Sequence, residues 1–538
     1  MSALNRLSNN FSNKLLNQPA LVPLKQPVFA MLWTAWLIAN LTMSMSDVAA
    51  AWLMTTLTHS PVMVALVATA STLPVFLLGL PSGAMADIID RRRYYAATQV
   101  WVSCTSIVIA LTAFAGLLNA PVLLLLTFLN GIGLAMRWPV FAAIVPDVVS
   151  RDDLPQALAL NAISMNLSRV IGPVVAGGLI ASMGGGAVFM LNAIFSVVGF
   201  ILIMRWKSTP KKSALPGERF VGAMRVGLQH VRQSPRMRIV LLRIFIFFFH
   251  STALMALMPL IAKEMHGGGP AMFTIMLSSM GAGAVAAALY FPKLRERYSR
   301  DGFVRFGTLG HALTSALVVL VPEIWVAIPA MALLGMAWIS SANSLSISAQ
   351  MALPNWVRAR GMSVYQMALM GGAALGALWW GQVAEWASIR TAVLAAAGLG
   401  VVMLILTRKL TVDGGEHQDF TPAQARVVSE VAVDLDPDDG PVMVTVEYRI
   451  DTSRSAEFMA VLEETRSARL RLGVLSWSLF KDVAVPGRYL EYFVDESWLE
   501  HQRRLERFTA ADVELRNRRQ AFQIDGSIPI VTRYVAQS

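Results

Sequence analysis

The chain of 538 residues is 55% hydrophobic and only 15% charged, whereas charged residues make up about a quarter of an average soluble protein. Lysine and arginine give a net charge of +11, and we interpret this excess as a membrane-topology signal before a nucleic-acid one. The single cysteine, Cys104, excludes an intramolecular disulfide and a cysteine-cluster metal site. We expect no metal, no other cofactor and no nucleic-acid partner.

Long apolar segments make up most of the chain. A bilayer core requires roughly 20 apolar residues per helix, and residues 28–409 have room for twelve such helices. The polar segment 205–236 separates six of them, in 28–204, from six in 237–409. The sequence therefore predicts an all-α polytopic membrane protein with twelve transmembrane helices in two six-helix halves. They are expected near 28–57, 61–86, 94–118, 121–145, 156–181, 186–204, 237–262, 270–291, 303–321, 324–350, 361–385 and 388–408.

Basic residues are concentrated in alternate turns between these segments. The turns near 58–60, 119–120 and 182–185 contain no lysine or arginine, whereas Arg91–Arg93 follow the second segment. Because cytoplasmic loops carry the excess of lysine and arginine, both termini and the segment 205–236 are expected in the cytoplasm. The tail 1–27 has no apolar stretch ending at a small-residue cleavage site, so we expect no cleaved signal peptide.

The central segment contains a predicted amphipathic helix. Its apolar residues recur at helical spacing, and polar residues occupy the rest of the helical wheel. This pattern predicts a helix lying at the cytoplasmic membrane surface, either as a strut between the halves or as a regulatory element. The apolar residues are Phe220, Met224, Leu228 and Val231.

The last part of the chain has the composition of a soluble domain. Residues 410–440 are acidic and form a predicted solvated linker. From Val442 to Ile450 apolar and polar residues alternate, which is typical of a β-strand. The further pattern reads strand, helix, strand, strand, helix, strand, so residues 441–538 are predicted to form an α+β ferredoxin-like domain.

Ionisable residues inside the apolar segments are functional candidates because they are costly in a membrane. Asp47 lies on a polar stripe with Asn40 and Ser44 in the first segment. Counting about 1.5 Å per residue places Arg169 in the fifth segment at a similar depth. We therefore predict that Asp47 and Arg169 approach each other, and that protonation of Asp47 releases the pair. The alternative is that Asp47 lies hydrated and without a function in the extracellular mouth of the bundle.

Further polar residues are candidates for the substrate path. Arg137 is expected near the cytoplasmic end of the fourth segment, too shallow to pair with Asp47, where it faces a vestibule or reaches the interface. His250 and His311 could relay protons or be neutral packing residues. The candidates for the substrate path are Asn40, Arg137, Asn161, Tyr365 and Gln366.

Two motifs indicate a family. The loop after the second segment reads Gly83-Ala-Met-Ala-Asp87-Ile-Ile-Asp90-Arg91-Arg92-Arg93. With twelve helices in two halves, it resembles the signature of the major facilitator superfamily, although Asp90 stands where that signature usually has glycine. In the fifth segment, a second motif is similar to the Gly-Pro-x-x-x-Gly-Gly signature of proton-driven exporters in this superfamily. It reads Gly172-Pro173-Val-Val-Ala-Gly177-Gly178.

The resemblance extends over residues 24–409. The phrases that begin at Pro146 and Pro354 resemble bacterial exporters known as transmembrane secretion effectors, a subgroup that includes the enterobactin exporter. The resemblance implies a protein of the bacterial inner membrane that exports a small amphipathic or siderophore-like compound by alternating access, coupled to the proton gradient. The chain has no Gly-Lys-Ser/Thr phosphate loop for ATP. Import remains an alternative, because the fold does not determine direction.

The first motif also suggests a gate. Asp87 is predicted to end the second helix on the cytoplasmic face, where the eleventh helix begins near Gly361. A carboxylate at a helix N-terminus is favourable, so Asp87 is expected to hold the two halves together there. Gly83, Arg91 and Arg92 complete this predicted gate.

The C-terminal domain resembles the antibiotic-biosynthesis-monooxygenase-like fold, which forms a dimeric α+β barrel. Trp498 and His501 carry this resemblance, which implies a possible homodimer through residues 441–538. Trp477 and Arg488 could join them in a cofactor-free oxygenase, but we favour a dimerisation or regulatory module and assign no catalytic residue. A bifunctional exporter whose domain processes the exported compound is the alternative.

Overall fold

The computed structural model describes residues 19–150, 153–206, 220–265, 268–294, 297–413, 419–423 and 435–537. Parts of the predicted tail 1–27, central segment 205–236 and linker 410–440 therefore lie outside the described residues. The chain divides into two units. The first comprises Met1–Gly217, Leu241–Ile347 and Tyr365–Asp413, and the second comprises Glu218–Val240, Ser348–Val364 and Gly414–Ser538.

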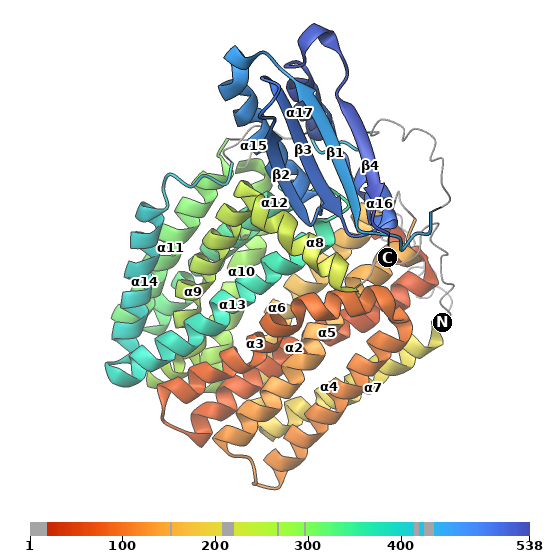
Figure 1. Ribbon diagram of the computed structural model, residues 1–538. Helices are drawn as coiled ribbons and strands as arrows, with labels where there is room; N and C mark the ends of the chain where they lie inside the picture. Colours follow the sequence, from red (N-terminus) through yellow and green to blue (C-terminus); the bar gives the residue numbers. More distant parts are fainter. Residues whose placement is uncertain are drawn as a thin grey trace. The chain divides into compact units, whose positions relative to one another are not determined.

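Six long helices form the first half of the bundle (Figure 1). Polar side chains at the turns explain where several begin, because each accepts a hydrogen bond from a backbone amide in the first turn. Ser60, Asp90 and Asn119 have this role, with Met63, Arg93 and Val122 as donors. After the short helix η1 (Pro19–Lys25), the helices are α2 (Pro27–Leu57), α3 (Pro61–Ile88), α4 (Arg91–Phe114), α5 (Ala120–Val148), α6 (Leu154–Met183) and α7 (Gly185–Arg205).

Six further long helices form the second half: α9 (Pro235–Glu264), α10 (Pro270–Leu294), α11 (Arg300–Leu320), α12 (Ile324–Met351), α13 (Arg358–Trp386) and α14 (Ile389–Leu406). Within the described residues, eleven of the long helices have the length and apolarity of a membrane span, and α13 is the exception. This differs from the predicted twelve. Glycines, tryptophans and Gln366 reduce the hydropathy of α13. This helix packs closely against α3 of the other half, because a Cβ at Gly371 would lie 2.8 Å from the ring of Phe76.

Small residues bring the two halves close together at two of the helix pairs between them, α3 with α13 and α6 with α10. Thr69 in α3 donates a 2.9 Å hydrogen bond to the Ala374 carbonyl in α13. Gly177 in α6 lies against Thr274 in α10, where an added Cβ would be 2.6 Å from the threonine side chain. Only glycine permits so close an approach, so these small residues determine how the halves fit together.

Buried apolar residues are distributed differently at the two ends of the bundle. One cluster lies at the end where α2 finishes, and its members include Met54, Leu260 and Ala384. It draws on all twelve long helices of both halves. A second cluster, at the end where α2 begins, includes Phe29 and Phe141, and its buried members in helices come from α2, α4, α5, α6 and α7. The halves therefore share a core at one end, while the first half has its own core at the other.

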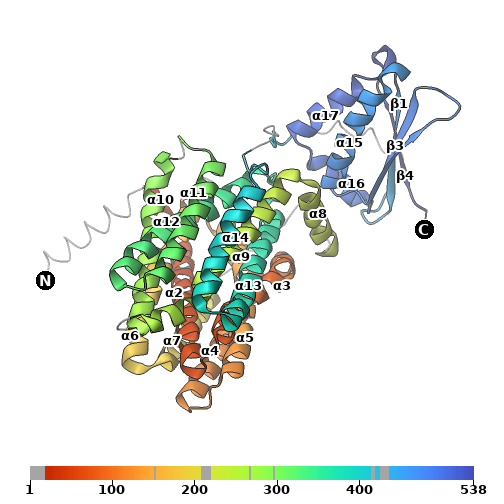
Figure 2. The ribbon, with the colours of Figure 1, turned by 90° about the vertical axis from the view of Figure 1, so that its left-hand side faces the viewer.

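The second unit contains a four-stranded antiparallel sheet with the order β2-β3-β1-β4. Figure 2 shows α15, α16 and α17 on one face of this sheet. The predicted second helix of the domain is divided into α16 and α17. The elements are β1 (Val442–Arg449), α15 (Ser455–Arg471), β2 (Ser476–Lys481), β3 (Arg488–Asp495), α16 (Trp498–Glu506), α17 (Ala510–Gln520) and β4 (Ile530–Val535), with short helices η2 (Thr452–Arg454) and η3 (Ile524–Gly526).

The predicted amphipathic helix is α8 (Phe220–Gln233), which belongs to the second unit. Its buried face differs from the predicted one, because Leu228 is 52% exposed whereas Val226 and His230 are buried. The reason is that α8 packs against the C-terminal domain. Gln229 Nε2 donates to the Val474 carbonyl at 2.9 Å, and Arg225 forms a 2.6 Å ion pair with Glu496.

Candidate functional site

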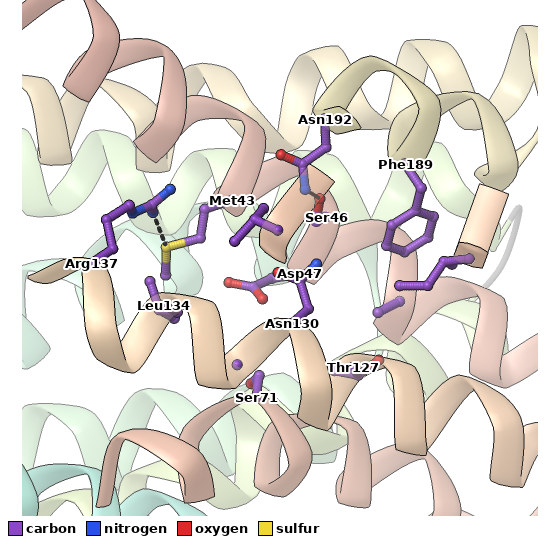
Figure 3. Close-up of a pocket in the computed structure, with 14 residues that line it drawn as sticks. Met43, Ser46, Asp47, Ser71, Thr127, Asn130, Leu134, Arg137, Phe189 and Asn192 are labelled. Atoms are coloured by element: carbon purple, nitrogen blue, oxygen red, sulfur yellow. Dashed lines mark hydrogen bonds between the residues drawn. The ribbon is translucent and has the colours of Figure 1, made fainter. Parts of the chain in front are cut away.

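A cavity lined by both polar and apolar side chains lies inside the first half of the bundle. Its lining comes from five helices that are apolar elsewhere, and Figure 3 shows Arg137 toward one end of the cavity and Phe189 toward the other. Asp47 is the acidic residue of the lining. The polar lining residues are Ser46 and Asp47 from α2, Ser71 from α3, Thr127, Asn130 and Arg137 from α5, and Asn192 from α7.

Asp47 and Arg137 both line this cavity, although the sequence predicts that Arg137 is too shallow to pair with Asp47. The carboxylate side chain is accessible because it faces the cavity, whereas Arg137 is 3% exposed. Arg137 Nη2 donates to Met43 Sδ at 3.6 Å, one helical turn from Asp47. The prediction counted helix depth from backbone positions alone, but a long arginine side chain extends several ångströms beyond its Cα.

Asparagine and serine side chains form a hydrogen-bonded wall beside Asp47. Asn192 Nδ2 in α7 donates to Ser46 at 2.9 Å and to Ser106 at 3.0 Å. Asn130 Nδ2 in α5 also donates to Ser106, at 3.5 Å. The network ties α2, α4, α5 and α7 together around the cavity. Asn130 and Asn192 were not predicted, although an asparagine in an apolar segment is itself a signal of a polar interior.

Arg169 lies elsewhere in this conformation. Its guanidinium carbon is 5.2 Å from the ring centroid of Trp338 in α12, a cation–π contact between the two halves. The predicted approach of Asp47 and Arg169 is therefore not present here. Trp338 had no distinguishing sequence signal, because aromatic residues are common in membrane helices.

The exporter-type motif of α6 lies between two neighbouring helices. A Cβ at Gly172 would be 2.5 Å from Ser44 Oγ in α2, and Gly177 meets Thr274 in α10. Gly178 has no neighbouring atom within 4 Å of such a Cβ, and Pro173 lies inside the helix. Two of the four motif residues thus serve close helix packing on opposite sides of α6.

The other predicted path residues are distributed over several contacts. Asn40 Nδ2 donates to Ser164 at 3.4 Å, and the buried Oδ1 of Asn161 has no hydrogen-bond partner among the described residues. The Tyr365 hydroxyl donates to the Ala342 carbonyl at 3.4 Å, and Gln366 is half-buried in α13. Asn40 and Asn161 thus belong to the α2–α6 side of the bundle, whereas Tyr365 joins α13 to α12.

The predicted gate lies at the turn between α3 and α4. Asp87 is in the last turn of α3, but its side chain lies outside the described residues. Gly83 and Arg91 are half-buried, and Arg92 Nη2 donates to the Met204 carbonyl at the end of α7. Asp90, the departure from the signature, accepts a 2.9 Å hydrogen bond from the Arg93 amide and so caps α4.

A family model for transmembrane secretion effectors in the major facilitator superfamily matches residues 18–538. The chain belongs to this family. The match covers the helical bundle and continues through the C-terminal domain, so the sheet and its helices lie within the matched region.

Relatives of this secretion effector are transporters of low sequence identity. The staphyloferrin A transporter of Staphylococcus aureus (strain NCTC 8325 / PS 47) is 23% identical over 244 residues, 45% of this chain and 61% of the relative. Macrolide efflux protein A of Streptococcus pyogenes is 21% identical over 263 residues, 48% of this chain and 65% of the relative. The chain thus spans less than two thirds of the length of either relative. The enterobactin exporter EntS of Escherichia coli O9:H4 (strain HS) is 24% identical over 403 residues, 74% of this chain and 95% of the relative.

A solved transporter structure shares the fold of the secretion effector's bundle. The crystal structure of the nucleoside transporter NupG superposes with a TM-score of 0.58 at 14% identity, covering 71% of this chain and 98% of that one. At this identity the likeness shows the fold alone: a multi-pass transporter bundle of the major facilitator type.

Polar residues of the effector's C-terminal domain are engaged in buried pairs. His501 Nδ1 donates to Asp495 at 2.7 Å, and Trp498 stacks on His501 at 5.3 Å between ring centroids. Trp477 Nε1 donates to Glu491 at 3.0 Å. Burial lowers the pKa of His501, against the raising effect of Asp495. With Arg488 paired to Asp482, all four oxygenase candidates have structural partners.

Proposed function

We propose that the chain is a secondary active exporter that moves a small amphipathic or siderophore-like compound out of the bacterial cytoplasm in exchange for protons. Its termini lie in the cytoplasm, as the distribution of basic turns predicts. The observation that carries the proposal is the accessible carboxylate of Asp47 in a cavity shared with the buried Arg137.

The chemistry of this cavity supports proton coupling. A charged carboxylate within a membrane is costly unless a cation or polar groups compensate it, and Arg137 and the asparagine–serine wall are close by. Protonation of Asp47 removes its negative charge and therefore its attraction to Arg137. Gain and loss of one proton then change the charge of the cavity and the interaction between α2 and α5.

The distribution of the buried clusters supports alternating access. The halves share an apolar core where α2 finishes, and Lys263 of α9 donates a 3.0 Å hydrogen bond to the Thr55 carbonyl of α2 at that end. With the predicted topology, that end faces outward. The conformation then corresponds to a transporter whose extracellular side is closed. Export also requires a second conformation in which the cytoplasmic side is closed and the extracellular side is open.

The relatives support the substrate class. Staphyloferrin A, macrolides and enterobactin appear in their names. We therefore propose a medium-sized compound with both polar and apolar parts. Its transport direction is outward, although the import of a similar compound uses the same fold.

Transport by an Asp47→Asn variant tests the proposal. Cells expressing the full chain should accumulate less of a macrolide or siderophore probe than cells without it, and an uncoupler should abolish the difference. Asp47→Asn should insert normally and lose the uncoupler-sensitive export, whereas Asp47→Glu should retain part of it. Export by Asp47→Asn at the wild-type rate would refute the role of this carboxylate, and greater accumulation with the chain present would indicate import.

The gate formed by Gly83, Asp87, Arg91 and Arg92 is part of the proposal. Its support is the hydrogen bond of Arg92 to the end of α7 and the place of Asp87 in the last turn of α3. A turn that served only membrane topology would tolerate Asp87→Asn. The gate requires that Asp87→Asn lose transport while membrane insertion, measured by fractionation, stays normal.

A homodimer through residues 441–538 is the proposed role of the C-terminal domain. The sheet face opposite its helices exposes apolar side chains, including Phe480 at 54%, Ile530 at 61% and Tyr534 at 52%. A second copy of the same ferredoxin-like face would cover them, as in the dimeric barrel that the domain resembles. Phe480→Asp should convert the full-length protein in detergent to monomer by light scattering, whereas an unchanged mass would refute this interface.

A further inference from the structure

The membrane helices of the second half contain very few ionisable residues. Between 244 and 262, 271 and 292, 306 and 320, 324 and 351, 361 and 384, and 391 and 406, the sequence has no aspartate, glutamate, lysine or arginine. Histidine occurs in these ranges only as His250 in α9 and His311 in α11. Because ionisable residues in membrane helices are costly, the presence of these two calls for a physical explanation.

The two histidines lie against each other in the fold. Their ring centroids are 5.8 Å apart with the planes at 88°, and each residue is 2% exposed. The ring of Phe247 contacts both, at 5.4 Å and 5.9 Å between centroids. Gly400 in α14 leaves room for His250, because an added Cβ would lie 2.7 Å from that ring. Three helices thus enclose the pair.

Hydrogen bonding leaves one nitrogen of each ring unsatisfied. His250 Nδ1 is 2.8 Å from the Ile246 carbonyl, which can only accept, so Nδ1 carries the proton and Nε2 of the neutral ring is a bare acceptor. His311 Nδ1 is 3.4 Å from Ser315 Oγ, which can donate or accept. Both Nε2 atoms are buried without a hydrogen-bond partner among the described residues. A buried polar atom without a partner calls for a physical explanation.

We propose that His250 and His311 form a proton-binding site in the second half of the transporter. One proton binds to Nε2 of one ring, and the lone pair on Nε2 of the other ring accepts the resulting N–H. Ser315 Oγ accepts from His311 Nδ1 in this state, so every ring nitrogen has a partner. No covalent bond other than the new N–H forms or breaks, and the pair gains a single positive charge.

The surrounding charges limit the site to one proton. The nearest charged groups along α9 are Arg243 and Lys263, along α11 Arg305, and along α14 Arg390 and Arg408. These are all cationic and lie toward the helix ends, while α12 has no charged residue within its bounds. No carboxylate along these helices is close enough in sequence to compensate a second positive charge in the pair.

A purely structural pair would behave differently. Two neutral imidazoles that only fill space would leave no reason for both Nε2 atoms to remain unpaired, because apolar side chains of similar shape avoid that cost. The role of this histidine pair in transport rests on the proposed proton coupling, in which Asp47 is the titrating group of the first half. Proton binding itself is measurable without transport or substrate.

The test is nitrogen-15 NMR of histidine-labelled, full-length protein in lipid vesicles, titrated from about pH 8 to about pH 5, the range in which histidines change charge. His250 and His311, assigned with single glutamine variants, should show joint uptake of one proton and a shared N–H···N signal. In His311→Gln, His250 should lose that signal and remain neutral.

Two results would overturn the site. One is that both rings stay neutral at the lowest pH, and the other is that His250 titrates equally in wild type and His311→Gln. A wild-type melting temperature of His311→Gln shows that loss of the signal in this variant is not unfolding. Asp47→Asn should leave the spectra unchanged, so failure of the pair and failure of the proposed export mechanism are separate outcomes.

Discussion

Replacement of Glu491 by glutamine should strongly destabilise the C-terminal domain. Glu491 is fully buried and accepts hydrogen bonds from Tyr448 at 2.8 Å, Trp477 at 3.0 Å and Arg469 Nε at 3.1 Å. Arg469 is 6% exposed, so glutamine leaves a buried guanidinium without its counter-charge. Removing one partner of a buried ion pair costs about 3–5 kcal/mol, a large share of the roughly 5–15 kcal/mol that stabilises a domain.

The pKa of Glu491 reflects the same buried interactions. Burial alone would raise this pKa, but attraction to Arg469 and Arg519 and the hydrogen bonds from Trp477 and Tyr448 lower it from 4.5 to about 2. Because the folded-state pKa is depressed, the stabilisation is complete above pH 4.5 and is lost as the pH falls toward 2. A shift of this size corresponds to about 3 kcal/mol.

Hydrogen exchange of β1 and β3 in the full-length protein in detergent measures this effect near neutral pH. Glu491→Gln should lower the protection of both strands by about 3 kcal/mol, and the difference from wild type should shrink below pH 4.5. Glu457→Gln is the matched control, because its pair with Arg454 is exposed at 65% and 48% and such pairs contribute at most about 1 kcal/mol. A loss below about 1 kcal/mol for Glu491→Gln would refute the reasoning.

Two predictions concern the contacts between the halves. Gly177→Val should impair transport and lower the thermal stability by about 1–3 kcal/mol, because the new side chain overpacks against Thr274. Gly178→Ala is the control and should have little effect, because the space around Gly178 is open. Equal melting curves for both variants would contradict this prediction. Glu385→Gln should weaken the closed end of the bundle, because the carboxylate accepts from Ser60 at 2.7 Å at the start of α3 and such a charge contributes about 0.3–1 kcal/mol. Pulsed-EPR distances between spin labels in the adjoining turns should then show up to about a fivefold larger open population, and an unchanged distribution would argue against this contact.

Local patterns in the sequence predict most of the helices and strands. Transmembrane helices must satisfy every backbone group internally, so length and apolarity alone place the long helices of both halves. The alternation from Val442 to Ile450 likewise predicts β1, because the buried residues of a strand facing a core recur every second position. The division of the last long helix of the domain into α16 and α17 was not predicted, since the intervening Phe508 and Thr509 bring their own packing and capping contacts.

The sequence also identifies Asp47, because an acid in an apolar helix is conspicuous by itself. Only the tertiary structure decides its surroundings. Helix rotation and side-chain length bring Arg137 into the cavity and direct Arg169 to Trp338, and neither quantity follows from depth counted along one helix. For the same reason α8 buries Val226 and not Leu228.

Composition and periodicity thus determined that this chain is a multi-pass membrane protein with a separate α+β domain, since those properties depend on interactions that are local or common to all helices in lipid. The tertiary structure decided which polar groups meet. His250 and His311 are unremarkable in two different apolar segments, and become a pair with unsatisfied nitrogens only when α9 and α11 pack together. The physical reason is that a polar site requires precise distances between distant segments, which the packing of many side chains sets jointly.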